Sequence, residues 1–194
     1  MNSGLLTPSI PTWSYEDRRT CQEIVEGIWL GPHMCGKDAA LLCEIKISDI
    51  ILVRAGEGAE RFSLKPRPEI DWISYYEIQM TDTSLDSSLN LFASTSELLT
   101  RLRASGSRVL VLGASGMSRS ASLVAAYLMK KFGLSLQQTC EYLMTRRRCV
   151  SISESLKRQL REFQVIIATL GASTQSRPKR QLEEEPETQI QSTA

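Results

Sequence analysis

Short runs of apolar and β-branched residues alternate with longer stretches of helical periodicity along most of the chain. Continuous or alternating apolar positions predict strands, and apolar positions three and four residues apart predict helices. The strand pattern predicts a strand–turn–strand unit at residues 23–31 and further strands at 47–53, 72–80 and 108–112. The helical pattern predicts helices at residues 39–45, 88–102, 118–132, 136–145 and 153–170.

The order of these elements predicts the fold class. Strands that alternate with helices, followed by an all-helical end, indicate an α/β fold whose central sheet is covered by helices on both faces. We expect a flexible lead-in at residues 1–12, one domain at 13–171, and a disordered tail at 172–194, where Ser, Gln, Pro and Glu replace the apolar periodicity. Residues 54–69, rich in Gly and Pro, predict a loop.

Composition narrows the function classes. A chain of 194 residues with 42% apolar content suits one domain with tails, and its 23 basic and 22 acidic residues nearly cancel. Neither nucleic acid nor a membrane is therefore expected as a partner, and no apolar run reaches membrane-spanning length. Five unclustered cysteines and a single histidine predict no metal site, and we expect no cofactor. Free thiols in a reducing intracellular compartment, in a monomer, are the simplest interpretation.

The candidate chemistry lies between residues 109 and 121. A β-branched strand runs into a loop of small residues, and a helix begins with the run Ser-Arg-Ser-Ala at residues 118–121. This arrangement directs backbone N–H groups at one anion, and an arginine adds a fixed fork of donors. An unrelated glycine-rich turn is the alternative. The predicted phosphate-binding residues are Gly113, Ala114, Ser115, Gly116, Met117, Ser118, Arg119 and Ser120.

This loop resembles that of tyrosine and dual-specificity phosphatases, which carry His-Cys, five residues, Arg, then Ser or Thr. Leu112 stands in the histidine place and Gly113 in the cysteine place, while Arg119 keeps the spacing. Residues 22–32 and 146–153 resemble other segments of those domains, so the resemblance covers about residues 13–170. With glycine in the cysteine place and an acidic tail, the chain is most similar to the Ser/Thr/Tyr-interacting pseudophosphatases. The resemblance implies a cysteine-phosphatase fold with a central mixed sheet.

The resemblance also implies a function. Members of that group bind phosphoproteins without hydrolysing them, and are implicated in holding MAP kinases and occupying an F-box ubiquitin-ligase adaptor. We therefore expect an inactive phosphatase-like module that binds phosphorylated proteins or such signalling partners and regulates them by sequestration or competition. A cytoplasmic location follows, with the nucleus as an alternative offered by the basic cluster at residues 177–180.

The missing nucleophile decides against catalysis. Cysteine phosphatases attack phosphorus with a thiolate, and Gly113 has no side chain with which to do so. Ser115 and Ser118 would need an adjacent base, and the only histidine, His33, is far away in the sequence. The alternative is an active dual-specificity phosphatase with residual or unconventional phosphomonoesterase activity, through one of these serines or an activated water.

By the resemblance, the amides from Gly113 to Arg119 would ring the phosphate and Arg119 would grip it. Ser120 would be the hydroxyl that assists thiolate departure in active relatives. Asp82 falls at the general-acid position, with Asp86 as a nearby alternative, and without a nucleophile we expect Asp82 to be a loop or helix-capping residue.

Two further features concern the surroundings of the loop. Leu112 cannot make the hydrogen bonds that histidine makes to the loop backbone. The three arginines at 146–148 suit either a docking patch for acidic partners or a solvated helix end.

Overall fold

A five-stranded mixed sheet forms the centre of the protein in a computed structural model that describes residues 14–55, 70–81 and 85–175 of the 194. The strands lie in the order β1-β2-β5-β3-β4; β1 is antiparallel to β2 and the other pairs are parallel. This confirms the predicted α/β class and mixed sheet. The strands are β1 (Gln22–Val25), β2 (Ile28–Pro32), β3 (Asp49–Arg54), β4 (Ser74–Gln79) and β5 (Val109–Gly113).

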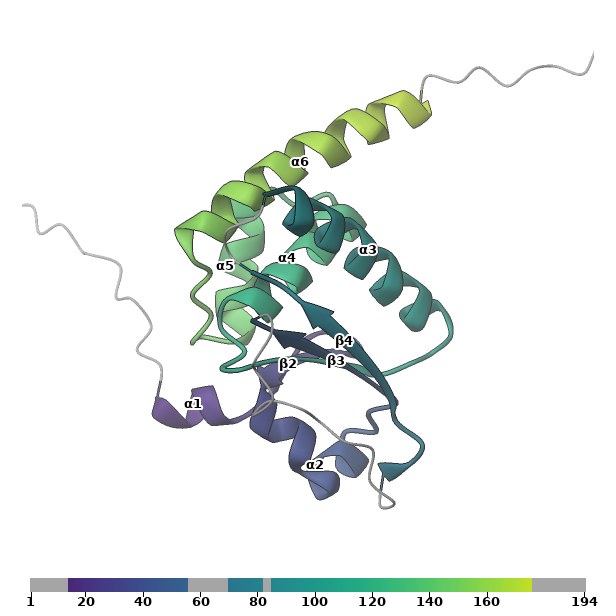
Figure 1. The fold of residues 1–194 in the computed structure, drawn as a ribbon, viewed down its shortest axis with the longest axis vertical. Coiled ribbons are helices and arrows are strands. Elements are labelled where there is room, and N and C mark those ends of the chain that lie inside the picture. Colours follow the sequence, from purple (N-terminus) through teal and green to yellow (C-terminus); the bar gives the residue numbers. More distant parts are fainter. Residues whose placement is uncertain (1–13, 56–69, 82–84, 176–194) are drawn as a thin grey trace, which may run out of the picture.

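Helices cover both faces of the sheet (Figure 1). The group α3 to α6 packs on one face, and α2 lies on the other together with the short 3₁₀ helix η1. The helices are α1 (Tyr15–Arg19), η1 (His33–Lys37), α2 (Ala39–Glu44), α3 (Leu85–Ala104), α4 (Arg119–Phe132), α5 (Leu136–Arg146) and α6 (Glu154–Gln175). None of the helices in the described part of the chain is long and apolar enough to cross a membrane.

The central strand β5 separates two hydrophobic cores. Its side chains alternate between the faces of the sheet. Val109 and Val111 enter the larger core under α3 to α6, which also holds Phe92. Leu110 and Leu112 enter the smaller core on the α2 side. Because β5 is buried on both faces, its continuous apolar sequence marks it as a central strand and fixes the position of the loop that follows.

Most predicted elements are confirmed, with boundaries shifted by a few residues. The helix predicted to end at residue 170 continues as α6 to Gln175, because the five residues from 171 include no proline and helical hydrogen bonding propagates past the last apolar contact. The sequence pattern missed α1 and η1, which are five residues each and too short for a periodicity. The lead-in at 1–12, most of the 54–69 loop and residues 176–194 lie outside the described residues.

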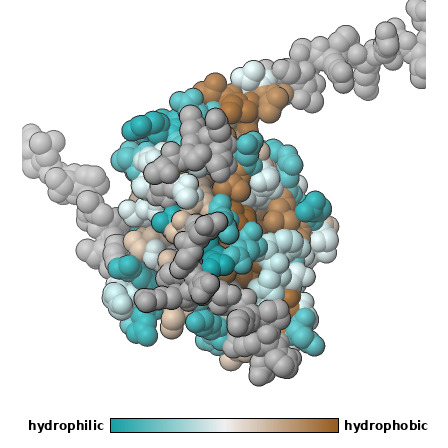
Figure 2. Space-filling view, viewed as in Figure 1, coloured by the Kyte–Doolittle hydropathy of each residue, from teal (hydrophilic) through white to brown (hydrophobic). Residues whose placement is uncertain are grey.

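The far end of α6 carries apolar side chains on its outer surface. Val165, Ile166 and Leu170 are exposed there, and Figure 2 shows hydrophobic residues gathered at this end of the helix. The opposite side of α6 contributes Leu156, Leu160 and Phe163 to the larger core. The first half of α6 is therefore anchored by packing, while its last turns extend beyond the body of the domain.

Replacing Leu112 by histidine, the residue at this place in the phosphatases it resembles, should destabilise the protein. Leu112 is fully buried in the smaller core with Leu42 and Ile47, and burying an imidazole there costs about 1–3 kcal/mol. Urea unfolding of Leu112→His beside the volume-conserving Leu112→Met measures this, and the latter should lose less than about 1.5 kcal/mol. Equal stability of Leu112→His and wild type would show that the imidazole finds hydrogen-bond partners at the loop.

Candidate functional site

The loop between β5 and α4 forms a small hollow. Residues Gly113 to Ser120, together with Val53, line a space of about 210 Å³. All eight residues predicted from the sequence therefore surround one cavity at the carboxyl edge of the sheet, where parallel α/β sheets bind ligands. That this cavity binds phosphate stays a prediction.

The carbonyl groups of the loop are held on its outer side. The Arg147 guanidinium donates from Nη2 to the Ser115 carbonyl and from Nε to the Gly116 carbonyl, both at 3.0 Å. The Ser151 amide donates to the Met117 carbonyl, also at 3.0 Å. In a trans peptide the C=O and the following N–H point in opposite directions. The N–H groups of residues 116, 117 and 118 therefore face the concave side of the loop.

Gly116 allows the loop to approach the sheet closely. Its φ of +67° lies in the left-handed region, and a Cβ built on it would lie 2.4 Å from the carbonyl carbon and oxygen of Gly31. These are backbone atoms at the end of β2 and cannot turn aside. The position therefore requires glycine for both conformation and space.

Gly113 lies at the floor of the hollow, against Ser120. A Cβ at this position would lie 2.7 Å from the Ser120 hydroxyl oxygen, which occupies the space that a side chain would need. Ser120 is 1% exposed, and its Oγ has no hydrogen-bond partner among the described residues. A buried hydroxyl without a partner costs free energy, so this hydroxyl is prepared to bond a ligand in the hollow.

The remaining polar residues of the loop differ in role. Ser118 Oγ accepts a hydrogen bond from the Ser153 amide at 3.1 Å, so this hydroxyl braces the loop against the start of α6. Arg119 is the first residue of α4 and lines the hollow. The N-terminus of this 14-residue helix adds a positive partial charge where an anion would lie.

His33 is closer to the loop than its sequence position suggests. The parallel register pairs Pro32 with Gly113, so His33 directly follows the residue beside the floor of the hollow. His33 is far from the loop in the sequence but not in space. The crossover between parallel strands brings the ends of β2 and β5 to the same edge of the sheet. Its side chain is 3% exposed.

The two candidate acids, Asp82 and Asp86, lie four residues apart in the sequence. Asp82 lies outside the described residues. Asp86 lies in the first turn of α3, and its role as an alternative acid stays a prediction.

Comparison with known proteins identifies the fold family. The family description "Dual specificity phosphatase, catalytic domain" matches residues 29–166. The chain belongs to the dual specificity phosphatase family. Among curated members, it is 30% identical to Serine/threonine/tyrosine-interacting protein B of Xenopus laevis over 168 residues, which is 82% of this chain and 74% of that protein. The human Serine/threonine/tyrosine-interacting protein is 31% identical with the same coverage.

Solved structures share the fold. The crystal structure of human tyrosine phosphatase-like serine/threonine/tyrosine-interacting protein superposes with a TM-score of 0.70 at 29% identity, covering 78% of this chain and 99% of that one. A second solved structure, that of PTPMT1, gives a TM-score of 0.66 at 21% identity and covers 79% of this chain and 99% of that one. The latter likeness concerns the fold alone.

The sequence did not reveal that Arg147 supports the loop from behind. Its side chain is 1% exposed, and besides the loop it donates from Nη1 to the carbonyls of Asp17 at 2.9 Å and Thr20 at 2.7 Å, and to the side-chain oxygen of Gln22. Burial lowers the pKa of this guanidinium from its ordinary value, yet an arginine stays protonated in proteins. One side chain thus joins the α1–β1 segment to the outer side of the loop.

Both interpretations of the three arginines are therefore wrong for Arg147. It belongs neither to an exposed docking patch nor to a solvated helix end, whereas Arg146 and Arg148 are exposed. A signal was present in the spacing: Thr139, Leu143 and Arg147 follow one another at intervals of four, on the buried side of α5. The position continues an inward-facing row.

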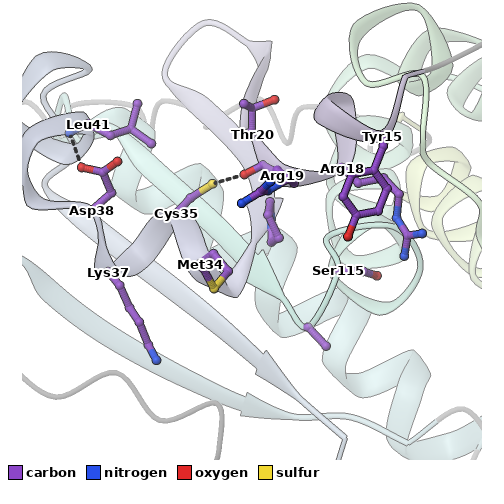
Figure 3. A pocket seen from close by; sticks show the side chains of 12 residues that line it. Tyr15, Arg18, Arg19, Thr20, Met34, Cys35, Lys37, Asp38, Leu41 and Ser115 are labelled. Atoms are coloured by element: carbon purple, nitrogen blue, oxygen red, sulfur yellow. Dashed lines mark hydrogen bonds between the residues drawn. The ribbon is translucent and has the colours of Figure 1, made fainter.

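A wider cleft opens beside the loop (Figure 3). It has a volume of about 910 Å³ and shares Ala114 and Ser115 with the loop. Its other walls come from α1 and the residues after it and from η1 and the start of α2. The charged residues in its lining are mostly basic: Arg18, Arg19 and Lys37, with Asp38 as the acidic one.

The two loop glycines should differ sharply in their tolerance of alanine. Gly116→Ala should lower the free energy of unfolding by at least about 2 kcal/mol, since it combines a left-handed conformation with a backbone clash. Gly113→Ala should cost less than about 1 kcal/mol, because the Ser120 hydroxyl can rotate away. Urea unfolding of both variants measures the difference, and equal losses would contradict the described packing of Gly116.

Removing the Arg147 guanidinium should destabilise the fold. Arg147→Met leaves buried carbonyls on two segments without a donor, at about 1–3 kcal/mol for each unsatisfied group, so we expect a loss of at least about 3 kcal/mol. The matched control Arg146→Met, on an exposed neighbour, should change stability by less than about 0.5 kcal/mol. Chemical unfolding compares the two, and similar losses would argue against the role given to Arg147.

Proposed function

We propose that this protein is a catalytically inactive phosphatase-like module that binds phosphorylated proteins and regulates them by sequestration or competition. The observation that carries the proposal is Gly113, which stands where the enzymes it resembles hold their nucleophilic cysteine, below a loop that is otherwise equipped for an anion. The names of the similar proteins, tyrosine phosphatase-like and interacting, support the same interpretation.

The loop favours a phosphate group through several kinds of donor. Three backbone N–H groups face its concave side, and the N-terminus of α4 adds its partial positive charge. Arg119 can offer a planar fork of donors that matches two phosphate oxygens, and the Ser120 hydroxyl can serve a third. These features require no covalent chemistry, so they suit reversible capture.

The absence of a thiolate favours binding over turnover. An active enzyme of this type holds a negative charge directly below the phosphate, and a glycine at that place removes the repulsion. The hydroxyl of Ser118 is engaged with the Ser153 amide, which leaves it poorly placed as a nucleophile. We therefore propose that phosphate groups are held without being released from their proteins.

The basic cleft supports a phosphoprotein rather than a small metabolite as the partner. A peptide whose phosphorylated residue enters the loop could lay its neighbouring residues along the cleft that begins at Ser115. Arg18, Arg19 and Lys37 favour acidic residues in that segment. MAP kinases and an F-box ubiquitin-ligase adaptor are the partner classes that the resemblance suggests, with the protein acting as a monomer in the cytoplasm or nucleus.

Phosphopeptide binding should depend on Arg119 and occur without turnover. The experiment titrates wild type with phosphotyrosine and phosphoserine peptides, and measures phosphate release from the same peptides. Arg119→Ala should weaken binding at least about tenfold, equivalent to about 1.4 kcal/mol, while the control Arg146→Ala should not. Gly113→Cys, which restores a thiol below the loop, should show phosphate release that wild type lacks.

Two other outcomes would replace the proposal. Phosphate release by wild type that disappears in Arg119→Ala would establish the enzyme alternative. Peptide affinity that is unchanged by Arg119→Ala, and by inorganic phosphate as competitor, would show that the loop is not the binding site. A thermal melt of each variant confirms that the fold is retained, so that a loss of binding is not a loss of structure.

A further inference from the structure

Two cysteines lie on either side of Gly31, next to the loop. Cys21 precedes β1, and the antiparallel register Gln22 with Leu30 places it across from Gly31. Cys35 lies in η1, which turns back over the end of β2. A Cβ built on Gly31 would lie 2.5 Å from the Cys21 Cβ and 3.5 Å from the Cys35 Sγ. The two side chains therefore share the space that a side chain on residue 31 would fill.

The contacts of the two thiols give them different reactivities. A hydrogen bond from the Cys35 thiol lowers the pKa of Cys21, and the nearby Arg147 charge acts in the same direction. The same hydrogen bond, together with burial, raises the pKa of Cys35. Burial also raises the pKa of Cys140 and Cys149. Cys21 is thus the more ready thiolate, beside a neutral thiol within reach.

The pair is also accessible. Cys35 lines the 910 Å³ cleft, and Figure 3 shows its sulfur directed at the carbonyl of Arg19, 3.5 Å away. Cys21 is partly exposed. A small oxidant can therefore reach Cys35 from the cleft and Cys21 from its partly exposed side.

We propose that a hydroperoxide oxidises Cys21 and Cys35 to a reversible disulfide. The two cysteines would then be a redox-modification site beside the loop. The Cys21 thiolate attacks one peroxide oxygen; the O–O bond breaks, a sulfenic acid forms, and hydroxide leaves as water. The Cys35 sulfur then attacks the Cys21 sulfur; the S–S bond forms, the S–O bond breaks, and a second water carries away the Cys35 proton. Two thiols and one hydrogen peroxide give one disulfide and two waters.

The modification would act on the same segment that Arg147 holds. Thr20, the neighbour of Cys21, accepts a hydrogen bond from Arg147, and Arg147 in turn donates to the loop carbonyls. A disulfide with its sulfurs about 2.05 Å apart would tie η1, which lines the cleft, to this segment. The proposed disulfide does not depend on which ligand the loop binds.

The sequence makes the test direct. Trypsin releases both cysteines in one peptide, residues 20–37, because no lysine or arginine lies between Arg19 and Lys37. Full-length reduced protein is exposed to hydrogen peroxide, alkylated, and digested without reduction. In the oxidised sample we expect this peptide without two hydrogens and without alkyl groups. Cleavage after Glu23 or Glu26 should leave its two parts linked, and a dithiol reductant before alkylation should restore both thiols.

Two variants sharpen the result. Cys35→Ser should abolish the linked form and leave Cys21 as a sulfenic acid that a dimedone probe captures, whereas the exposed Cys43 can be replaced by serine without effect. Full alkylation of Cys21 and Cys35 after peroxide treatment would overturn the proposal. So would separate oxidation of the two sulfurs to sulfinic acids without a linked peptide in wild type.

Discussion

The buried guanidinium of Arg147 is the interaction on which the site depends. It gathers carbonyl groups from the segment before β1 and from the loop after β5, and so fastens together two parts of the chain that the β1-β2-β5 order of the sheet brings close. The hydrogen bonds described for it go to neutral oxygens. Its positive charge lies behind the loop, where it would add to the attraction of the loop amides for the anion that we propose.

The wall and the floor of the hollow are built from different parts of the residues. The wall is determined by backbone: a left-handed glycine, carbonyls held from outside, and the first turn of α4. The floor is determined by two side chains, one missing at Gly113 and one without a partner at Ser120. The anion binding that we propose would need only the wall, whereas covalent chemistry would need a reactive side chain at the floor.

The sequence predicted what depends on local pattern. The alternating and continuous apolar runs located the five strands and the longer helices, and the run from Val109 to Ser120 located the loop. Gly133, with a φ of +67°, ends α4 as a glycine after a helix should. The five-residue helices were missed because a helix of about one turn is too short to show a repeating pattern of apolar residues. The sequence signal of α1 was only the capping box formed by Ser14 and Asp17.

Other features depend on distant parts of the chain and could not be predicted locally. Three consecutive arginines look alike until the phase of α5 selects the middle one for burial. The nearness of His33 to Gly113 depends on β2 being the neighbour of β5, which strand patterns alone do not specify. The positions of Arg147 and His33 thus depend on tertiary structure and not on a local sequence motif.

Gly31 links two sites that look separate. Its backbone is the surface on which Gly116 rests, and the side chain it lacks leaves the space that Cys21 and Cys35 share. Any change of this residue would disturb the anion loop and the thiol pair at once, so selection cannot adjust one of them there without the other. A chain under pressure to keep either feature would retain this glycine, and the second feature would be inherited with it.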